Sequence, residues 1–378
     1  MMEKKFKNIK SPPSPPLEGG TKKEFNEKLS HLWISSLKSK GRGLQNIKFN
    51  DFCLEDLYIA YYDCRKNKRN TKNALDFEMN LEENIIKLYN DLKSWNYKIW
   101  TSICFIAKYP KPREIFAANF RDRIVHHLVY NKIEPIFAKT FVYDSSASQK
   151  WKWVHFAQKR LYKHCQSITN NFKQKWYYLQ MDMKNFFPSI DKNVLEKILI
   201  KKIPKWFYRD LVLQILWHNP TNDFSFRWDK NLYTKIKKYK SLFFAKNNKW
   251  LAIWNLTSQL FANIYLNELD NYIKRDLKCK YYQRYVDDFI ILDLDNNRLK
   301  YLREKIKKFS QEKLNIEVHP NKIIMQRIDQ WINYVWAIIK PFLMYTRNRT
   351  YGNFENILYK NNSPLNLLPN IREEGYKN

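Results

Sequence analysis

Apolar residues recur with a helical period in several stretches of this 378-residue chain. Within residues 22–96 they lie three or four positions apart, as in Leu54, Leu57 and Tyr61, so we predict a helical N-terminal region there. Residues 1–21 are Pro-rich and have no such period, which fits either a disordered N-terminus or an upstream start codon chosen in error. The same spacing predicts further helices over 121–137, 260–273 and 298–314.

Two other segments have the composition of β-strands, and both end in acidic residues. Residues 280–292 are rich in β-branched and aromatic side chains on either side of Asp287 and Asp288, which fall where a hairpin would turn. Residues 177–182 form a similar run that ends in Asp182. Paired aspartates are often ordinary turn formers. A third acid in a matching context favours a shared site instead.

Carboxylates this close together repel each other unless a cation lies between them. Three of them on neighbouring strand ends can hold two Mg²⁺ ions, which stabilise the attacking and leaving oxygens of an in-line phosphoryl transfer. The pattern therefore indicates nucleotidyl transfer of the kind that polymerases catalyse.

From about Tyr97 to Pro341 the chain resembles the reverse transcriptase family, with the sequence blocks in the family's order. The segment Asn255–Asp270, which contains Ser258-Gln259, is most similar to the enzymes of diversity-generating retroelements. The resemblance implies an α+β right-hand polymerase fold, with an antiparallel palm sheet backed by helices. Fingers and palm would occupy residues 97–341, and residues 342–378 would form a short or incomplete thumb or a tail.

The resemblance also implies roles for individual residues. Two Mg²⁺ ions, with Mn²⁺ as an alternative, would be held at Asp182, Met183, Asp287 and Asp288. Lys322 would protonate the departing pyrophosphate, and Phe187 would be the steric gate that excludes a 2′-hydroxyl. Lys111 and Arg113 would bind the triphosphate of the incoming nucleotide. The other substrate-binding positions would be Phe187, Ile253, Trp254 and Gln259.

Charge and composition agree with a nucleic-acid enzyme. There are 68 Lys and Arg against 37 Asp and Glu, a formal net charge of +31, which favours polyanionic partners. Five dispersed cysteines, no signal peptide and no long apolar run predict a cytoplasmic protein with reduced thiols and no membrane segment. The interleaved Lys and aromatic residues of 204–249 fit nucleic-acid binding and an amphipathic face equally well.

The expected function is RNA-directed DNA synthesis, with an RNA template, a DNA or RNA primer and dNTPs as partners. Membership of a diversity-generating retroelement would add a small basic accessory protein and error-prone copying, because Ile253 replaces a polar contact to the nascent base pair. The alternatives are a group II intron, retron or phage-defence reverse transcriptase, or a catalytically inactive RNA-binding protein on the same scaffold.

The chain contains only six glycines, where an average composition of about 7% would give roughly 26, and thirteen tryptophans. Several tryptophans stand where the family pattern has glycine, although an indole cannot replace glycine where the backbone needs positive φ. We therefore expect that UGA codons for glycine have been read as tryptophan. Genuine substitutions in an inactive polymerase are the alternative. The positions concerned are Trp151, Trp153, Trp250, Trp254, Trp331 and Trp336.

Overall fold

The computed structural model describes residues 52–66, 71–107, 111–227, 233–234, 236–246, 248–253, 255–327 and 331–347. The chain divides into two compact units, residues 1–51 and 52–378, and every described residue belongs to the second. The Pro-rich segment 1–21, residues 22–51 of the predicted helical region, residues 348–378 of the predicted thumb or tail, and Trp254 lie outside the described residues. None of the described helices is long and apolar enough to cross a membrane.

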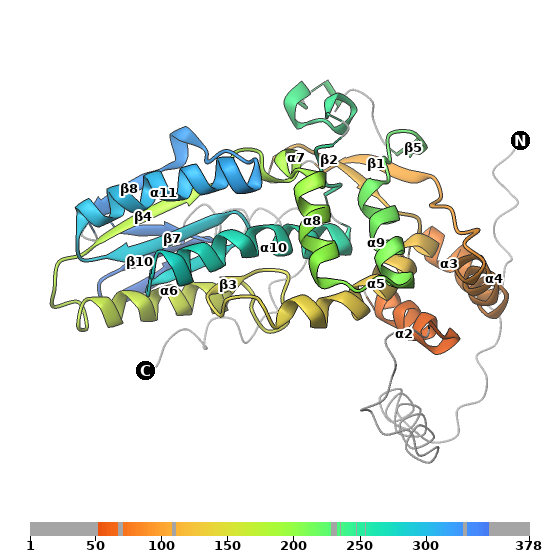
Figure 1. Ribbon diagram of the computed structural model, residues 1–378, viewed down its shortest axis with the longest axis horizontal. Coiled ribbons are helices and arrows are strands. Elements are labelled where there is room, and N and C mark those ends of the chain that lie inside the picture. The colour runs from red at the N-terminus through yellow and green to blue at the C-terminus, as the bar shows by residue number, and fades with distance from the viewer. Residues whose placement is uncertain are drawn as a thin grey trace, which may run out of the picture. The chain divides into compact units, whose positions relative to one another are not determined.

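The helices predicted within the described residues are present, and their ends follow local capping chemistry. The helix expected from residue 121 begins at Phe120, because the Asn119 side chain accepts a hydrogen bond from the Arg121 backbone N–H. Figure 1 shows the order of the elements along the chain. The helices are α2 (Leu54–Arg65), α3 (Lys72–Glu78), α4 (Leu81–Lys93), α5 (Phe120–Ala138), α6 (Val154–Ile168), α7 (Phe186–Ser189), α8 (Lys192–Lys202), α9 (Phe207–Trp217), α10 (Leu256–Asn271) and α11 (Asn296–Leu314), with short turns η2 (Lys238–Lys240), η3 (Leu242–Phe244), η4 (Tyr272–Asp276) and η5 (Pro320–Lys322).

A central five-stranded sheet has the order β3-β6-β7-β4-β8. Its strands are β3 (Ser145–Ser146), β4 (Tyr177–Asp182), β6 (Tyr282–Tyr285), β7 (Asp288–Asp293) and β8 (Ile324–Arg327). All pairings are antiparallel except that of β3 with β6. The α+β class and the antiparallel sheet predicted from the sequence are therefore confirmed.

Side chains along β7 alternate between two hydrophobic cores, as the two-residue period of a strand requires. Phe289 and Ile291 belong to the larger core, which includes buried residues of α10 and α11. Ile290 and Leu292 belong to a smaller core with buried residues of α6. Strands β4 and β7 thus run between α11 and α6 (Figure 1), and their buried faces fix the register at which the strand ends meet.

A second sheet, with the order β2-β1-β5, contains a hairpin over residues 102–117. Strand β1 (Ser102–Ala107) pairs antiparallel with β2 (Arg113–Ala117), and β5 (Phe224–Phe226) pairs parallel with β1. The segment 204–249 supplies β5 and packs its aromatic rings against this sheet, with Phe243 5.6 Å from Phe116 between ring centroids. Phe224, Phe226, Tyr233 and Phe243 therefore pack together, whereas Tyr239 and Phe244 are exposed beside the exposed lysines of η2.

A third sheet follows β8 and has the order β11-β10-β9. Strands β9 (Ile332–Tyr334) and β10 (Ala337–Lys340) form a hairpin. A further strand, β11 (Leu343–Thr346), pairs antiparallel with β10. The first residues of the segment predicted to be thumb or tail are thus part of this sheet, because β10 has a free edge that β11 can pair with.

Candidate functional site

The three predicted aspartates meet at one edge of the central sheet. Asp182 is the last residue of β4 and lies directly opposite Asp288, the first residue of β7, in the antiparallel register. Asp287 occupies the two-residue turn between β6 and β7. Directly opposed residues of an antiparallel pair have their Cβ atoms about 4.5–5.5 Å apart, so the two strand carboxylates are close neighbours.

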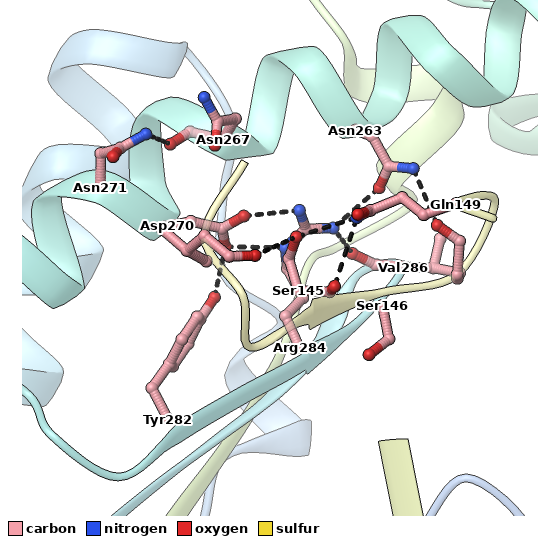
Figure 2. Close-up of polar contacts among 12 residues, drawn as sticks. Ser145, Ser146, Gln149, Asn263, Asn267, Asp270, Asn271, Tyr282, Arg284 and Val286 are labelled. Atoms are coloured by element: carbon pink, nitrogen blue, oxygen red, sulfur yellow. Dashed lines mark hydrogen bonds and ion pairs between the residues drawn. The ribbon is translucent and has the colours of Figure 1, made fainter. Parts of the chain in front are cut away.

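The turn that carries Asp287 is strained, and a buried arginine supports its backbone through a hydrogen bond. Val286 has φ +57°, a region that a β-branched residue rarely occupies. Its carbonyl oxygen accepts a 2.7 Å hydrogen bond from Nη1 of Arg284. Nε and Nη2 of Arg284 donate in turn to the carboxylate of Asp270 on α10, at 2.7 and 2.6 Å (Figure 2). This ion pair therefore connects the buried face of α10 to the backbone of the aspartate turn.

The surroundings of the aspartates disfavour three negative charges. Burial, followed by repulsion from Asp182, raises the pKa of Asp287 to about 6. Burial also raises the pKa of Asp288 to about 7, although Gln180 Nε2 donates to both of its oxygens at 3.0 and 3.1 Å. Lys322 Nζ lies 2.8 Å from Asp182 Oδ2. A site in which carboxylates are driven toward protonation has a strong electrostatic demand for cations.

Carboxylate oxygens are the donors that Mg²⁺ prefers, so the residue types fit the predicted ion. In their present orientations these side chains do not surround a single point. No group of three or more His, Cys, Asp or Glu side chains among the described residues is gathered as a metal site. Asp182 instead faces the Lys322 ammonium, and Asp288 faces the Gln180 amide. Met183, predicted beside them, is buried and forms an isolated β-bridge to Val318.

Of the predicted phosphate-binding residues, Arg113 is close enough for its positive charge to lower the pKa of Asp287. It is exposed at the start of β2, and Lys111 is exposed two residues earlier. The second sheet therefore places one cation within electrostatic range of the aspartates.

The remaining predicted contact residues surround the loop that leads into α10. Phe186 is buried in the core, whereas Phe187 is half-buried and its carbonyl oxygen accepts a 3.1 Å hydrogen bond from the Leu251 backbone N–H. Of the two rings, Phe187 is thus the one available as a steric gate. Ile253 is half-buried, and Gln259 Oε1 accepts a hydrogen bond from Ser148 Oγ at 3.1 Å.

Polar contacts join this loop to the second sheet. The Asn255 side chain meets the Ala118 backbone N–H and the Phe116 carbonyl oxygen, each at 3.4 Å. Behind them His126 Nδ1 lies 2.7 Å from Thr257 Oγ1, which gives this buried histidine a packing and hydrogen-bonding role. Side chains at the start of α10 therefore connect the predicted substrate-binding loop to the second sheet.

No protein-family model matches this chain, and no curated protein matches it in sequence. Among solved structures, apo telomerase from Candida tropicalis truncated from its C-terminal domain aligns with 66% of this chain and 55% of its own, at 12% identity and TM-score 0.47. Another structure of apo telomerase from that organism aligns with 66% and 48%, at 11% identity and TM-score 0.45. The chain spans about half the length of each. Both TM-scores lie below 0.5, so we base the function on the site itself.

Sequence reasoning missed the ion pair between Asp270 and Arg284. Both side chains are almost fully buried, and the two residues are fourteen positions apart in the chain. Asp270 ends the segment used to recognise the family, and Arg284 stands two residues before the turn, so both were visible in the motifs. A charged residue at an inward-facing position of a predicted strand is the signal that could have identified the pair.

Proposed function

We propose that this protein is an RNA-directed DNA polymerase that extends a primer with dNTPs by two-metal nucleotidyl transfer. The observation that carries the proposal is the cross-strand pair of Asp182 and Asp288 with Asp287 in the adjoining turn. The resemblance of residues 97–341 to reverse transcriptases supports the reaction class. The net charge of +31 supports RNA and DNA as partners.

Each residue then has a role in the reaction. Two bound Mg²⁺ ions would supply Lewis acidity at the reacting oxygens, and Asp182, Asp287 and Asp288 would hold them. Arg113 and Lys111 would orient the triphosphate. The ammonium of Lys322, now 2.8 Å from Asp182, would be free to donate a proton to pyrophosphate once that carboxylate has a different partner.

The retroelement subtype is a finer proposal that depends on the loop before α10. Ile253 offers no hydrogen bond to a base pair, so discrimination between correct and incorrect nucleotides would be weak. A variable cDNA, a template-repeat RNA and a small basic accessory protein would then be the product and partners. Replacing Ile253 by Gln should lower misincorporation. Unchanged misincorporation in an active enzyme would favour the intron, retron or phage-defence alternatives.

Primer extension on an RNA template, with Mg²⁺ and dNTPs, tests the activity. Asp288→Asn should reduce the rate by roughly 10³-fold or more, because the lost ligand contributes several kcal/mol to the transition state. Asp293→Asn is the matched control at the other end of β7, where Asp293 pairs with Arg298 at 3.2 Å and should leave the rate unchanged. The assay is run with the printed chain and with a variant carrying glycine at the suspect tryptophans.

The outcomes separate the two classes of function. Extension that is lost in Asp288→Asn and kept in Asp293→Asn supports the polymerase. A folded protein that binds RNA but extends no primer in either version would identify an RNA-binding scaffold and refute the proposal.

A further inference from the structure

The tryptophans of this chain fall into two groups according to backbone conformation. Ten of the thirteen are described, since Trp33, Trp228 and Trp254 are not. Five of these ten have positive φ, a conformation found in a few per cent of non-glycine residues. Their φ values are +60° at Trp95, +66° at Trp151, +94° at Trp250, +41° at Trp331 and +67° at Trp336.

Positive φ brings Cβ too close to the neighbouring carbonyl oxygen, and only glycine, which has no Cβ, adopts it freely. Asparagine and aspartate tolerate it through local hydrogen bonds, but an indole has no such compensation. At +94°, Trp250 lies even beyond the narrow left-handed region that other residues can occupy. Half of the described tryptophans thus stand where the backbone favours the residue in which this chain is deficient.

Two of the positions are glycine sites by their local structure alone. Trp95 follows the C-cap Ser94 of α4, and its N–H bonds to the Leu92 carbonyl oxygen, which is the position after a helix where glycine is most common. Trp336 is the second residue of the two-residue turn between β9 and β10, and Val335 before it has φ +40°. A turn with positive φ at both positions strongly prefers glycine at the second.

Four of the five indoles are at least half exposed and gain little from packing, whereas Trp250 is buried, at 4% exposed. The exposed fractions are 83% for Trp151, 54% for Trp336, 53% for Trp95 and 51% for Trp331. By contrast, Trp176 is fully buried, and Trp206 is 8% exposed with φ −157°. Trp176 and Trp206 have the backbone and burial of ordinary tryptophans. The chain therefore holds both genuine tryptophans and five that fit glycine.

We propose that the protein made in its own host carries glycine at residues 95, 151, 250, 331 and 336, and that the printed sequence has UGA codons translated as tryptophan. The proposal rests on backbone geometry and not on the proposed function. It adds Trp95 to the six positions expected from the sequence. Trp153, which has φ −86°, gains no support from its backbone, and Trp254 is outside the described residues.

Glycine would also change the surroundings of the candidate site. Gln180, which holds Asp288, donates to the Asn333 carbonyl oxygen at 3.3 Å, and Gln158 donates to that of Val335 at 2.7 Å. The hairpin that contains Trp336 is therefore attached through β9 to Gln180 of β4 and through its turn to Gln158 of α6. If the proposed function holds, glycine there removes an exposed indole from a hairpin at which a nucleic-acid backbone could approach closely.

Codon reading and peptide mass spectrometry test the proposal without any activity assay. The gene should carry UGA at all five positions and UGG at Trp176 and Trp206, and peptides from the host's own protein should contain glycine at the five. UGG at Trp336 and Trp250, or UGA with tryptophan in the host peptides, would overturn it. Since neither readout involves polymerisation, failure of the proposed function leaves this result unaffected.

Recombinant variants test the geometric premise separately. Trp151→Gly should melt at a higher temperature than Trp151→Ala, because alanine keeps the Cβ that conflicts with φ +66°. Trp217 is the control, since it is also exposed but lies in α9, where the backbone is helical, so alanine should melt no lower than glycine there. The same order of melting temperatures at both positions would refute the geometric premise.

Discussion

Breaking the buried ion pair between Arg284 and Asp270 should destabilise the fold. The two side chains are 1% and 0% exposed and are joined by contacts of 2.6 and 2.7 Å. Removal of one partner leaves the other charge buried without compensation, which costs about 3–5 kcal/mol. Arg284→Met should therefore lower the free energy of unfolding by that amount, measured by urea denaturation with an unchanged dependence on urea concentration.

The double variant Arg284→Met/Asp270→Leu distinguishes charge burial from simple loss of packing. With both charges replaced by apolar groups, no carboxylate remains uncompensated, so the double variant should be more stable than the sum of the single effects predicts, by about 2 kcal/mol. Strictly additive single and double effects would refute the idea that uncompensated charge dominates.

The same arginine should also affect activity through the turn. Arg284→Lys keeps the positive charge but cannot bond Asp270 with two nitrogens while also donating to Val286. We expect a folded protein with reduced primer extension. Arg298→Lys, at an ion pair in which the arginine is 45% exposed, is the control and should retain activity. Full activity of Arg284→Lys would show that the turn does not depend on this support.

Three further predictions concern stability. Lys192 is 6% exposed, and burial lowers its pKa to about 8, so Lys192→Met should raise the free energy of unfolding at pH 7 by roughly 1–3 kcal/mol. Because unfolded lysine binds a proton that the folded form releases, the stability difference between Lys192→Met and the wild type should shrink from pH 8 to 10.5, and an unchanged difference would contradict this. Burial and the nearby charges of His127, His218 and Arg123 lower the pKa of His126 to about 3. Stability should therefore fall by roughly 1.4 kcal/mol per unit as the pH drops below 6.5, and His126→Gln should remove that part of the slope in denaturation curves. Trp336→Gly should stabilise the protein by about 1 kcal/mol, a rise in melting temperature of roughly 1–2 °C by calorimetry, whereas a fall would contradict the strain at φ +67°.

The sequence predicted those helices and strands whose signals lie within a short stretch of the chain. The two strand runs and their terminal acids were enough to place Asp182 and Asp288 together, because buried alternation along the strands leaves little freedom of register. The contacts of Arg284 were not predictable in this way, since they join a strand to a helix that packs against it only in the folded chain. Trp95 was also missed. It belongs to no family block, and only the backbone reveals its conformation.

The aspartate turn combines several features that separately oppose folding. It places like charges together, partly buries them, and holds a β-branched residue at φ +57°. Strain of this kind persists only where the surrounding structure over-determines it. Here hydrophobic cores on two faces fix β7, and a buried guanidinium holds the Val286 carbonyl oxygen. A turn that served only to connect two strands would gain nothing from such an arrangement. A turn that must present two carboxylates to cations at a fixed spacing would, because the bound cations remove the repulsion that the fold otherwise has to withstand.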